Sequence, residues 1–202
     1  MFILKKNIAI YYTLMAFLMF SAFYLMLGFY LQGNINKLVP APVSQTMTSE
    51  VTQSSSGLPT QLIIPTINVN AQIISLGLAS DGSVDVPKGP HQTSWFNLGP
   101  KPGEKGSAVI SGHYGIWKNG TDSVFNLLPN LKIGDNIYVK DEKGITHSFV
   151  VEKTKIYGKN EIVPEIFNKN DDAYLNIITC NGTWLANEKT YSQRLVVFAK
   201  EQ

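Results

Sequence analysis

The sequence is poor in cysteine and arginine. Its 202 residues include one cysteine, Cys180, and one arginine, Arg194, while the other sixteen basic residues are lysines. A single cysteine cannot form a disulfide within its own chain, so a disulfide-stabilised scaffold is excluded. This cysteine and three scattered histidines also lack the spacing of a metal site. We therefore predict neither a metal nor a cofactor.

Charge is absent from residues 7–36. Within this stretch, 8–31 are nearly all apolar or aromatic. As a helix they would extend about 36 Å, against about 30 Å of bilayer hydrocarbon. Lys5 and Lys6 precede the run, which predicts a cytoplasmic amino terminus. A cleaved signal peptide is the alternative, but the run is long for one and no small-residue cleavage site follows. Residues 1–32 are thus predicted to be a single-pass transmembrane helix in the cell membrane, with the rest of the chain extracellular.

The segment 33–60 lacks apolar periodicity and is rich in Ser, Thr, Pro and Gln. Such a composition does not bury enough surface to fold, so we predict a flexible stalk. Residues 61–202 then form one domain, with enough chain for a hydrophobic core. The first 60 residues hold three lysines and one glutamate, which leaves 14 basic and 14 acidic residues in this domain. This balance gives no indication of nucleic-acid binding.

The domain has no long amphipathic helix and no internal repeat. Short β-branched and apolar runs separated by turn signals predict a mainly β fold, either a sandwich or a barrel. The predicted strands are 62–64, 71–76, 107–112, 136–140, 145–157, 174–180 and 195–200. Asp81-Gly82 indicates a hairpin turn between 76–78 and 84–86.

Two short helices are predicted between the strands. One covers 124–128 and is expected to end at Pro129. The other covers 163–167, inside the loop 158–173. A loop of this length in a compact domain is usually functional or mobile.

The lone cysteine and the lone arginine fall at the junction of the last two predicted strands. Cys180 ends one strand and Arg194 begins the next, so antiparallel pairing would place both at one rim beneath a loop 181–193. His113 also ends a strand, although the sequence does not say whether at the same rim. A nearby imidazolium or guanidinium stabilises a reactive thiolate, and arginine can also donate to an acyl oxyanion. The three residues together fit acyl transfer through a thioester.

The two other histidines are weaker candidates. His147 lies within strand 145–157, at a position that we expect to be exposed. His91 lies in a Pro-rich loop, where we expect it to make a local hydrogen bond.

Three short segments resemble the signature blocks of sortases, the cysteine transpeptidases of bacterial surfaces. They are AVISGH (108–113), NIITC (176–180) and RLVVFA (194–199), and the resemblance extends over essentially all of 61–202. The stretches 73–90 and 95–113 look most like class E and class F-like sortases. The family usually has Thr and Leu where this chain has Asn176 and Ile177, which affects the shape of the substrate groove rather than the nucleophile.

The resemblance implies a fold and a reaction. The fold would be a sortase-type eight-stranded β-barrel with a few short helices. Cys180 would attack the Thr–Gly bond of a Leu-Pro-x-Thr-Gly-like sorting signal, His113 would protonate the leaving amine, and Arg194 would hold the substrate backbone and the oxyanion. Thr179 would shape the substrate groove. An amine of peptidoglycan or of a pilin would then release the thioester and form a new amide bond with the surface protein.

The same resemblance assigns the loop 158–173 to substrate recognition. Some class A members bind calcium next to such a loop, and here the loop carries Glu161, Glu165, Asp171 and Asp172. We interpret these four carboxylates as solvated surface groups rather than calcium ligands.

Two alternatives remain open from the sequence. One is an enzyme like the L,D-transpeptidases of the cell wall, although in that family the histidine and cysteine stand close together, whereas His113 and Cys180 are 67 residues apart. The other is a non-catalytic, membrane-tethered β-domain that binds surface proteins and holds Cys180 as an inert thiol.

Overall fold

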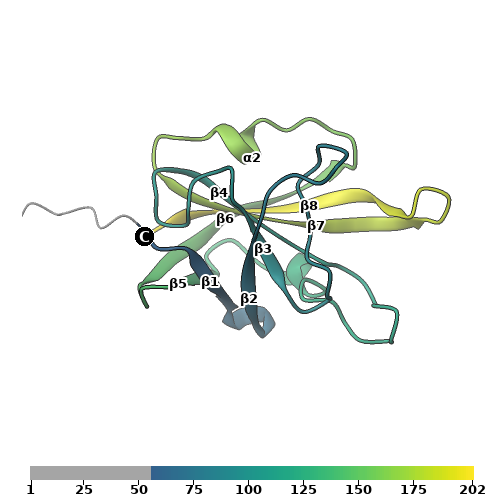
Figure 1. Ribbon diagram of the computed structural model, residues 1–202, viewed down its shortest axis with the longest axis horizontal. Helices are drawn as coiled ribbons and strands as arrows, with labels where there is room; N and C mark the ends of the chain where they lie inside the picture. Colours follow the sequence, from purple (N-terminus) through teal and green to yellow (C-terminus); the bar gives the residue numbers. More distant parts are fainter. Residues whose placement is uncertain (1–55) are drawn as a thin grey trace, which may run out of the picture. The chain divides into compact units, whose positions relative to one another are not determined.

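The computed structural model describes residues 56–202, which fold as a closed barrel of eight strands (Figure 1). The order around the barrel is β1-β2-β3-β4-β7-β8-β6-β5. Neighbours are antiparallel except for β2–β3 and β4–β7, which are parallel. The strands are β1 Pro59–Ile64, β2 Val69–Leu76, β3 Thr93–Phe96, β4 Gly106–Gly112, β5 Asn136–Asp141, β6 Thr146–Gly158, β7 Ala173–Leu185 and β8 Thr190–Glu201. The prediction of a mainly β barrel is therefore confirmed.

Two hydrophobic clusters lie on opposite sides of the barrel wall. The larger one fills the interior, because alternate residues of each strand point inward. In β6, for example, Phe149 and Val151 are fully buried and Val150 between them is only half-buried. The smaller cluster lies on the outer face and consists of Val109, Ile166, Val196 and Phe198. Ile166 belongs to the short helix α2 (Glu165–Asn168), so α2 covers part of this outer face.

Several connections differ from the sequence predictions. Asp81-Gly82 does form a turn, with Gly82 at φ +82°, but one bridge between Leu78 and Val84 replaces the expected pair of strands. A second short helix, η2 (Leu128–Asn130), begins where 124–128 was expected to end. Pro129 lies inside its first turn, where a missing backbone N–H costs nothing. Helix α2 confirms the short helix predicted near 163–167.

Strand β3 was missed because it is short and follows a Pro-rich loop. Its central residue, Trp95, points into the core and donates Nε1–H to the Pro100 carbonyl at 2.9 Å. The last two strands were predicted too short. They continue past Cys180 and Arg194 to a tip at 186–189, so the expected loop 181–193 is mostly strand. Cross-strand pairs such as Trp184 with Tyr191 extend this hairpin beyond the barrel.

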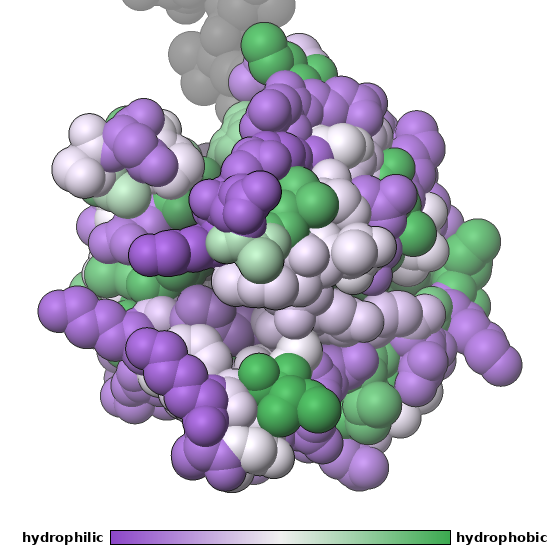
Figure 2. All heavy atoms as spheres, turned by 90° about the vertical axis from the view of Figure 1, so that its right-hand side faces the viewer, coloured by the Kyte–Doolittle hydropathy of each residue, from purple (hydrophilic) through white to green (hydrophobic). Residues whose placement is uncertain are grey.

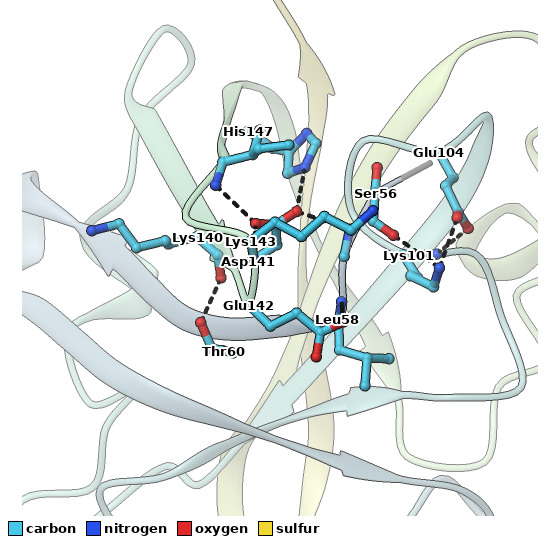
Figure 3. A network of polar contacts seen from close by, with 12 residues as sticks. Ser56, Leu58, Thr60, Lys101, Glu104, Lys140, Asp141, Glu142, Lys143 and His147 are labelled. Carbon is cyan, nitrogen blue, oxygen red and sulfur yellow. Dashed lines mark hydrogen bonds and ion pairs between the residues drawn. The ribbon is translucent and has the colours of Figure 1, made fainter. Parts of the chain in front are cut away.

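Buried Asp141 joins the first described residues to the barrel (Figure 3). Its Oδ2 accepts the Gly57 N–H at 2.8 Å, and its Oδ1 accepts the N–H groups of Lys143 and Ile145 at 2.9 and 2.8 Å. The Ser56 carbonyl also accepts a hydrogen bond from Lys101 Nζ at 2.9 Å. The folded chain therefore begins a few residues before the expected boundary at 61, because these backbone groups already have partners in the barrel.

The rest of the predicted stalk and the whole predicted anchor lie outside the described residues. From residue 56 onward, no helix is both long enough and apolar enough to cross a bilayer.

Candidate active site

Strand register brings His113, Cys180 and Arg194 to one end of the barrel, which we call the His113 end. Parallel β4 and β7 pair Ser111 with Ile178, and His113 and Cys180 each lie two residues further along. Antiparallel β7 and β8 pair Cys180 directly with Arg194. Neighbouring strands are about 4.8 Å apart, so three adjacent strands present the three side chains together. The sequence left open whether His113 shares the rim of Cys180, and the parallel pairing shows that it does.

The alternation of the strands also places these side chains on the outer face of the barrel. Ile177 and Leu195 belong to the interior cluster, so their neighbours Ile178 and Val196 point outward beneath α2. Cys180 follows Ile178 by two positions and Arg194 precedes Val196 by two, so both share this outward set. Both are half-buried, so a ligand can reach the thiol and the guanidinium from outside the barrel.

His113 is held by two neighbours. Its Nε2 lies 2.6 Å from the Pro87 carbonyl oxygen, and its ring packs on Trp117 with centroids 4.8 Å apart. A carbonyl oxygen only accepts hydrogen bonds, so Nε2 carries a hydrogen. Proton exchange with a substrate is thereby left to Nδ1.

Arg194 is fixed by the hairpin from which it projects. Its Nη1 donates to the carbonyls of Tyr191 and Gln193 at 3.0 and 2.9 Å, and its Nη2 donates to Thr190 Oγ1 at 3.1 Å. These bonds use three of the five guanidinium hydrogens. The hydrogen on Nε and one on Nη2 are left for a ligand, in a fork whose orientation is already set.

Aromatic side chains flank the cysteine on the β7–β8 hairpin. Tyr191 packs edge-on against Tyr114 and Trp184, with centroids 5.5 and 5.2 Å away. Burial raises the pKa of Tyr191, and the nearby Cys180 and Tyr114 add to the rise because they disfavour a second negative charge. The tyrosine therefore stays a neutral wall beside the thiol at physiological pH.

Figure 2 shows the molecule from the side where this hairpin projects. Apolar residues form separate patches between polar and intermediate ones rather than one continuous apolar surface. Close to the site in the chain, Ile116 lies three residues after His113 and Trp184 lies on the hairpin, and both are exposed. This face therefore offers no broad apolar surface for a partner to cover.

Two buried residues of β7 make hydrogen bonds to backbone carbonyls near the site. Thr179 is 3% exposed and donates its hydroxyl hydrogen to the Gly112 carbonyl at 2.8 Å, which ties β7 to the residue before His113. Asn176, at the position where the family usually has Thr, donates Nδ2–H to the Ile166 carbonyl of α2 at 2.7 Å. Both hydrogen bonds hold backbone near the site. The substrate-binding role of Thr179 stays a prediction.

The acidic residues of loop 158–173 have partners within the protein. Glu165 pairs with Lys153, and this hydrogen-bonded lysine holds the pKa of Glu165 below its ordinary value. Asp172 pairs with Lys200, and Glu161 accepts the Gly158 N–H. A cation would have to compete for these oxygens, and the absence of calcium stays a prediction.

His147 is not exposed as expected. Its side chain is 12% exposed and its Nδ1 lies 3.0 Å from Glu201 Oε1. Its Nε2 lies 3.9 Å from Asp141 Oδ2, beyond hydrogen-bond range. Tyr157, which pairs with Arg194, lies ten positions after His147 in β6, so His147 is about 33 Å from the His113 end.

Sequence reasoning missed Pro87, Thr190 and Tyr191. Each acts on a site residue through its backbone, a hydroxyl group or a ring contact, and none belongs to a motif with a chemical meaning of its own. The available signals were the two prolines close together in Val86-Pro-Lys-Gly-Pro90 and the closeness of Thr190 and Tyr191 to the only arginine.

Comparisons with known proteins agree with this geometry. The family model described as the sortase domain matches residues 62–202. Sortase C-1 from Actinomyces oris is 22% identical, with a TM-score of 0.57 over 71% of this chain and 73% of that chain. A lid mutant of sortase A from Corynebacterium diphtheriae is 21% identical, with a TM-score of 0.57 over 73% of this chain and 71% of its own.

A third solved structure, a sortase D5 transpeptidase from Clostridium perfringens, is 20% identical, with a TM-score of 0.54 over 72% of this chain and 79% of that chain. At such identities the three structures establish the fold. A search of the curated proteins finds no significant match. The suggested likeness to classes E and F stays a prediction. Because the family model covers more than two thirds of the sequence, the chain belongs to the sortase family of cysteine transpeptidases.

Proposed function

We propose that this chain is a membrane-anchored sortase that cleaves a Leu-Pro-x-Thr-Gly-like sorting signal between Thr and Gly and joins the surface protein to an amine. The observation that carries the proposal is the register that places His113, just after β4, beside Cys180 of β7 and Arg194 of β8. Membership of the sortase family removes the two alternatives, an L,D-transpeptidase-like enzyme and an inert β-domain.

The first half-reaction is acylation of Cys180. The thiolate sulfur bonds to the threonine carbonyl carbon, and the carbonyl oxygen takes the negative charge within reach of the free Arg194 hydrogens. The tetrahedral intermediate then expels the glycine amine as its C–N bond breaks. His113 Nδ1 gives that amine its proton, leaving a thioester on Cys180 and a neutral imidazole.

The second half-reaction reverses this path with a different amine. The incoming nitrogen attacks the thioester carbonyl, and His113 Nδ1 takes the proton that the nitrogen loses. The C–S bond breaks, the thiolate is restored and an amide joins the surface protein to its acceptor. The acceptor is an amine of peptidoglycan or of a pilin, and a comparison of the two as substrates distinguishes wall anchoring from pilus assembly.

The test uses the purified full-length chain with a library of Leu-x-x-Thr-x peptides. Mass spectrometry should find a thioacyl adduct on Cys180 and, after addition of an amine, a ligated product. The Cys180→Ala variant is the control and should form neither. If no peptide in the library gives an adduct, or if the variant processes peptides like the wild type, the proposed reaction is wrong.

The membrane placement is part of the same proposal. Residues 8–31 would anchor the chain with its amino terminus in the cytoplasm, and the catalytic barrel would lie outside the cell. Cys180 is the only cysteine and is half-buried, so a thiol reagent that labels it shows on which side of the membrane the barrel lies. A membrane-impermeant maleimide added to intact cells should label the wild type and not Cys180→Ser. Labelling that appears only after lysis would contradict this topology.

A further inference from the structure

The segment Asp85–Pro90, which we call the strap, crosses the barrel beside His113. At its start, the Asp85 N–H donates to the Gly77 carbonyl at 3.0 Å. At its end, the Pro90 carbonyl accepts a hydrogen bond from the Val124 N–H at 2.8 Å. Pro87 is buried between these two fixed points and turns its carbonyl to His113 Nε2. Two prolines restrict the backbone further, because each fixes its own φ.

A pair of buried serines holds the strap from below. Ser94 of β3 and Ser111 of β4 face each other in register and are 1% and 6% exposed. Their hydroxyl oxygens are 2.7 Å apart, and each lies 3.4 Å from the Asp85 carbonyl oxygen. The pair has two hydroxyl hydrogens. One bridges the two serines and the other points to Asp85, and either serine can make the second contact.

This arrangement acts on His113 through the strap. Hydrogen bonding of the Asp85 carbonyl limits the movement of the Pro87 carbonyl two residues later, because the intervening chain is short and the φ of Pro87 is fixed. The Pro87 carbonyl keeps the hydrogen of His113 on Nε2 and the ring in one orientation, so Nδ1 is the atom that delivers the proton. A carboxylate does this work in many enzymes that use a catalytic histidine, whereas here the partner is a neutral carbonyl.

We propose that Ser94 and Ser111 are positioning residues for His113, acting as interchangeable donors that hold the strap and its Pro87 carbonyl in place. The inference rests on the proposed function, in which His113 is the general acid. It requires that losing one hydroxyl has little effect, because the remaining serine still reaches Asp85. Loss of both hydroxyls frees the strap.

The experiment compares Ser94→Ala, Ser111→Ala and the double variant in the full-length chain. The first readout is NMR of ¹⁵N-labelled histidine, which reports the tautomer of His113 and the exchange rate of its Nε2 hydrogen with water. The second is the steady-state kinetics of peptide transfer. We expect the single variants to resemble the wild type. The double variant should lose the fixed tautomer, exchange roughly 10-fold faster, and show kcat lower by about 10-fold with KM nearly unchanged.

Ser107→Ala is the matched control. Ser107 lies at the other end of β4, is 2% exposed, and also donates to a backbone carbonyl, that of Lys169. It should leave the His113 ring and kcat as in the wild type. An equal effect of this control would mean that the double variant acts through general loss of packing, which overturns the proposal. So would a double variant that behaves like the wild type, or single variants as damaging as the double.

Pro87→Gly covers the case in which the double variant does not fold. It keeps the carbonyl, lies outside the strands and releases the strap, so faster exchange of the Nε2 hydrogen is expected. Unchanged exchange in Pro87→Gly overturns the proposal. The ring measurement needs no substrate. If the wild type transfers no peptide, the proposed function fails, but the NMR measurement of the His113 ring still tests whether the two serines position it.

Discussion

Two histidines at opposite ends of the barrel show how partners assign different work to the same side chain. At the His113 end, His113 meets a neutral carbonyl and an aromatic ring, next to a thiol and an arginine. At the other end, which we call the His147 end, His147 lies near Asp141 (Figure 3), and its Nδ1 is 3.0 Å from Glu201 Oε1. The Glu201 carboxylate holds the His147 ring in place, whereas the Pro87 carbonyl orients the His113 ring and leaves its other nitrogen free.

The surroundings of the two histidines differ as well. Outward-pointing, half-buried side chains and a projecting hairpin make the His113 end accessible to a peptide. At the His147 end, the buried carboxylate of Asp141 fixes the first folded residues to the turn between β5 and β6. Substitutions at the first end should therefore change turnover, and substitutions at the second end should change stability.

The largest effect should come from replacing each of the two histidines in turn by glutamine. His113→Gln should lower kcat/KM for peptide transfer by roughly 10²–10⁴, since the proposed general acid is lost, with little change in the thermal midpoint. His147→Gln should keep turnover and lower stability by about 1–3 kcal/mol, because the half-buried Glu201 carboxylate loses its hydrogen-bond partner. Peptide-transfer assays and thermal unfolding of both variants check this. A His147 variant that folds but does not turn over would break the distinction.

The second effect concerns the shape of the guanidinium. Arg194→Lys keeps the charge but loses the fork, so it should lower kcat by about 10²–10³ if Arg194 stabilises the oxyanion. The unfolding midpoint should change little, because the lysine remains on the half-exposed edge of the hairpin. Near-wild-type turnover would show that charge alone is sufficient at this position.

The two ends also differ in how far the sequence predicts them. Alternating apolar residues predicted most strands, and the rare Cys180 and Arg194 with His113 marked the candidate site. Parallel pairing of β4 with β7 was beyond the sequence, since it joins segments 67 residues apart and no local pattern encodes it. Strand β3 escaped notice because only four residues pair.

The environment of His147 was unpredictable for a related reason. Its partner Glu201 is 54 residues away, and they meet only because β6 and β8 pair along their length. Local alternation made position 147 look exposed, but Gly103 and Ser56 come from other parts of the chain to cover it. The role of the Pro87 carbonyl was hidden as well, because side-chain identity does not reveal what a backbone group will face.

The third prediction tests how closely the His147 end is packed. A Cβ atom on Gly103 would overlap the His147 ring, and its φ of +87° is unfavourable for other residues. Gly103→Ala should cost about 3 kcal/mol, measured by denaturant unfolding, while the folded fraction keeps its turnover. Adding His147→Ala removes the clash and should recover part of the loss. If the double variant is less stable than either single variant, ring overlap is not the cause.

The smallest loss of stability should come from replacing one carboxylate oxygen of Asp141 by an amide nitrogen. In Asp141→Asn, the oxygen that accepts from Lys143 and Ile145 is retained, but an amide NH₂ replaces the oxygen that accepts from Gly57. Two donors then face each other, which should cost about 1–3 kcal/mol near neutral pH. Turnover should be unchanged, since the His113 end is not touched.

The pH dependence of this loss separates charge from geometry. Burial opposes ionisation of Asp141, but the N–H groups of Gly57, Ile145 and Lys143, together with His147, outweigh it and hold its pKa below the ordinary 3.8. A carboxyl with a lowered folded-state pKa stabilises the fold above its unfolded pKa, and this contribution is lost as the pH falls through the folded value. The stability difference between wild type and Asp141→Asn should therefore be full at pH 5–7 and shrink below about pH 4. Repeating the series with His147→Gln in both proteins removes the contribution of His147 to the pKa of Asp141. A difference that stays constant down to pH 2 would mean that the amide costs stability through its shape alone.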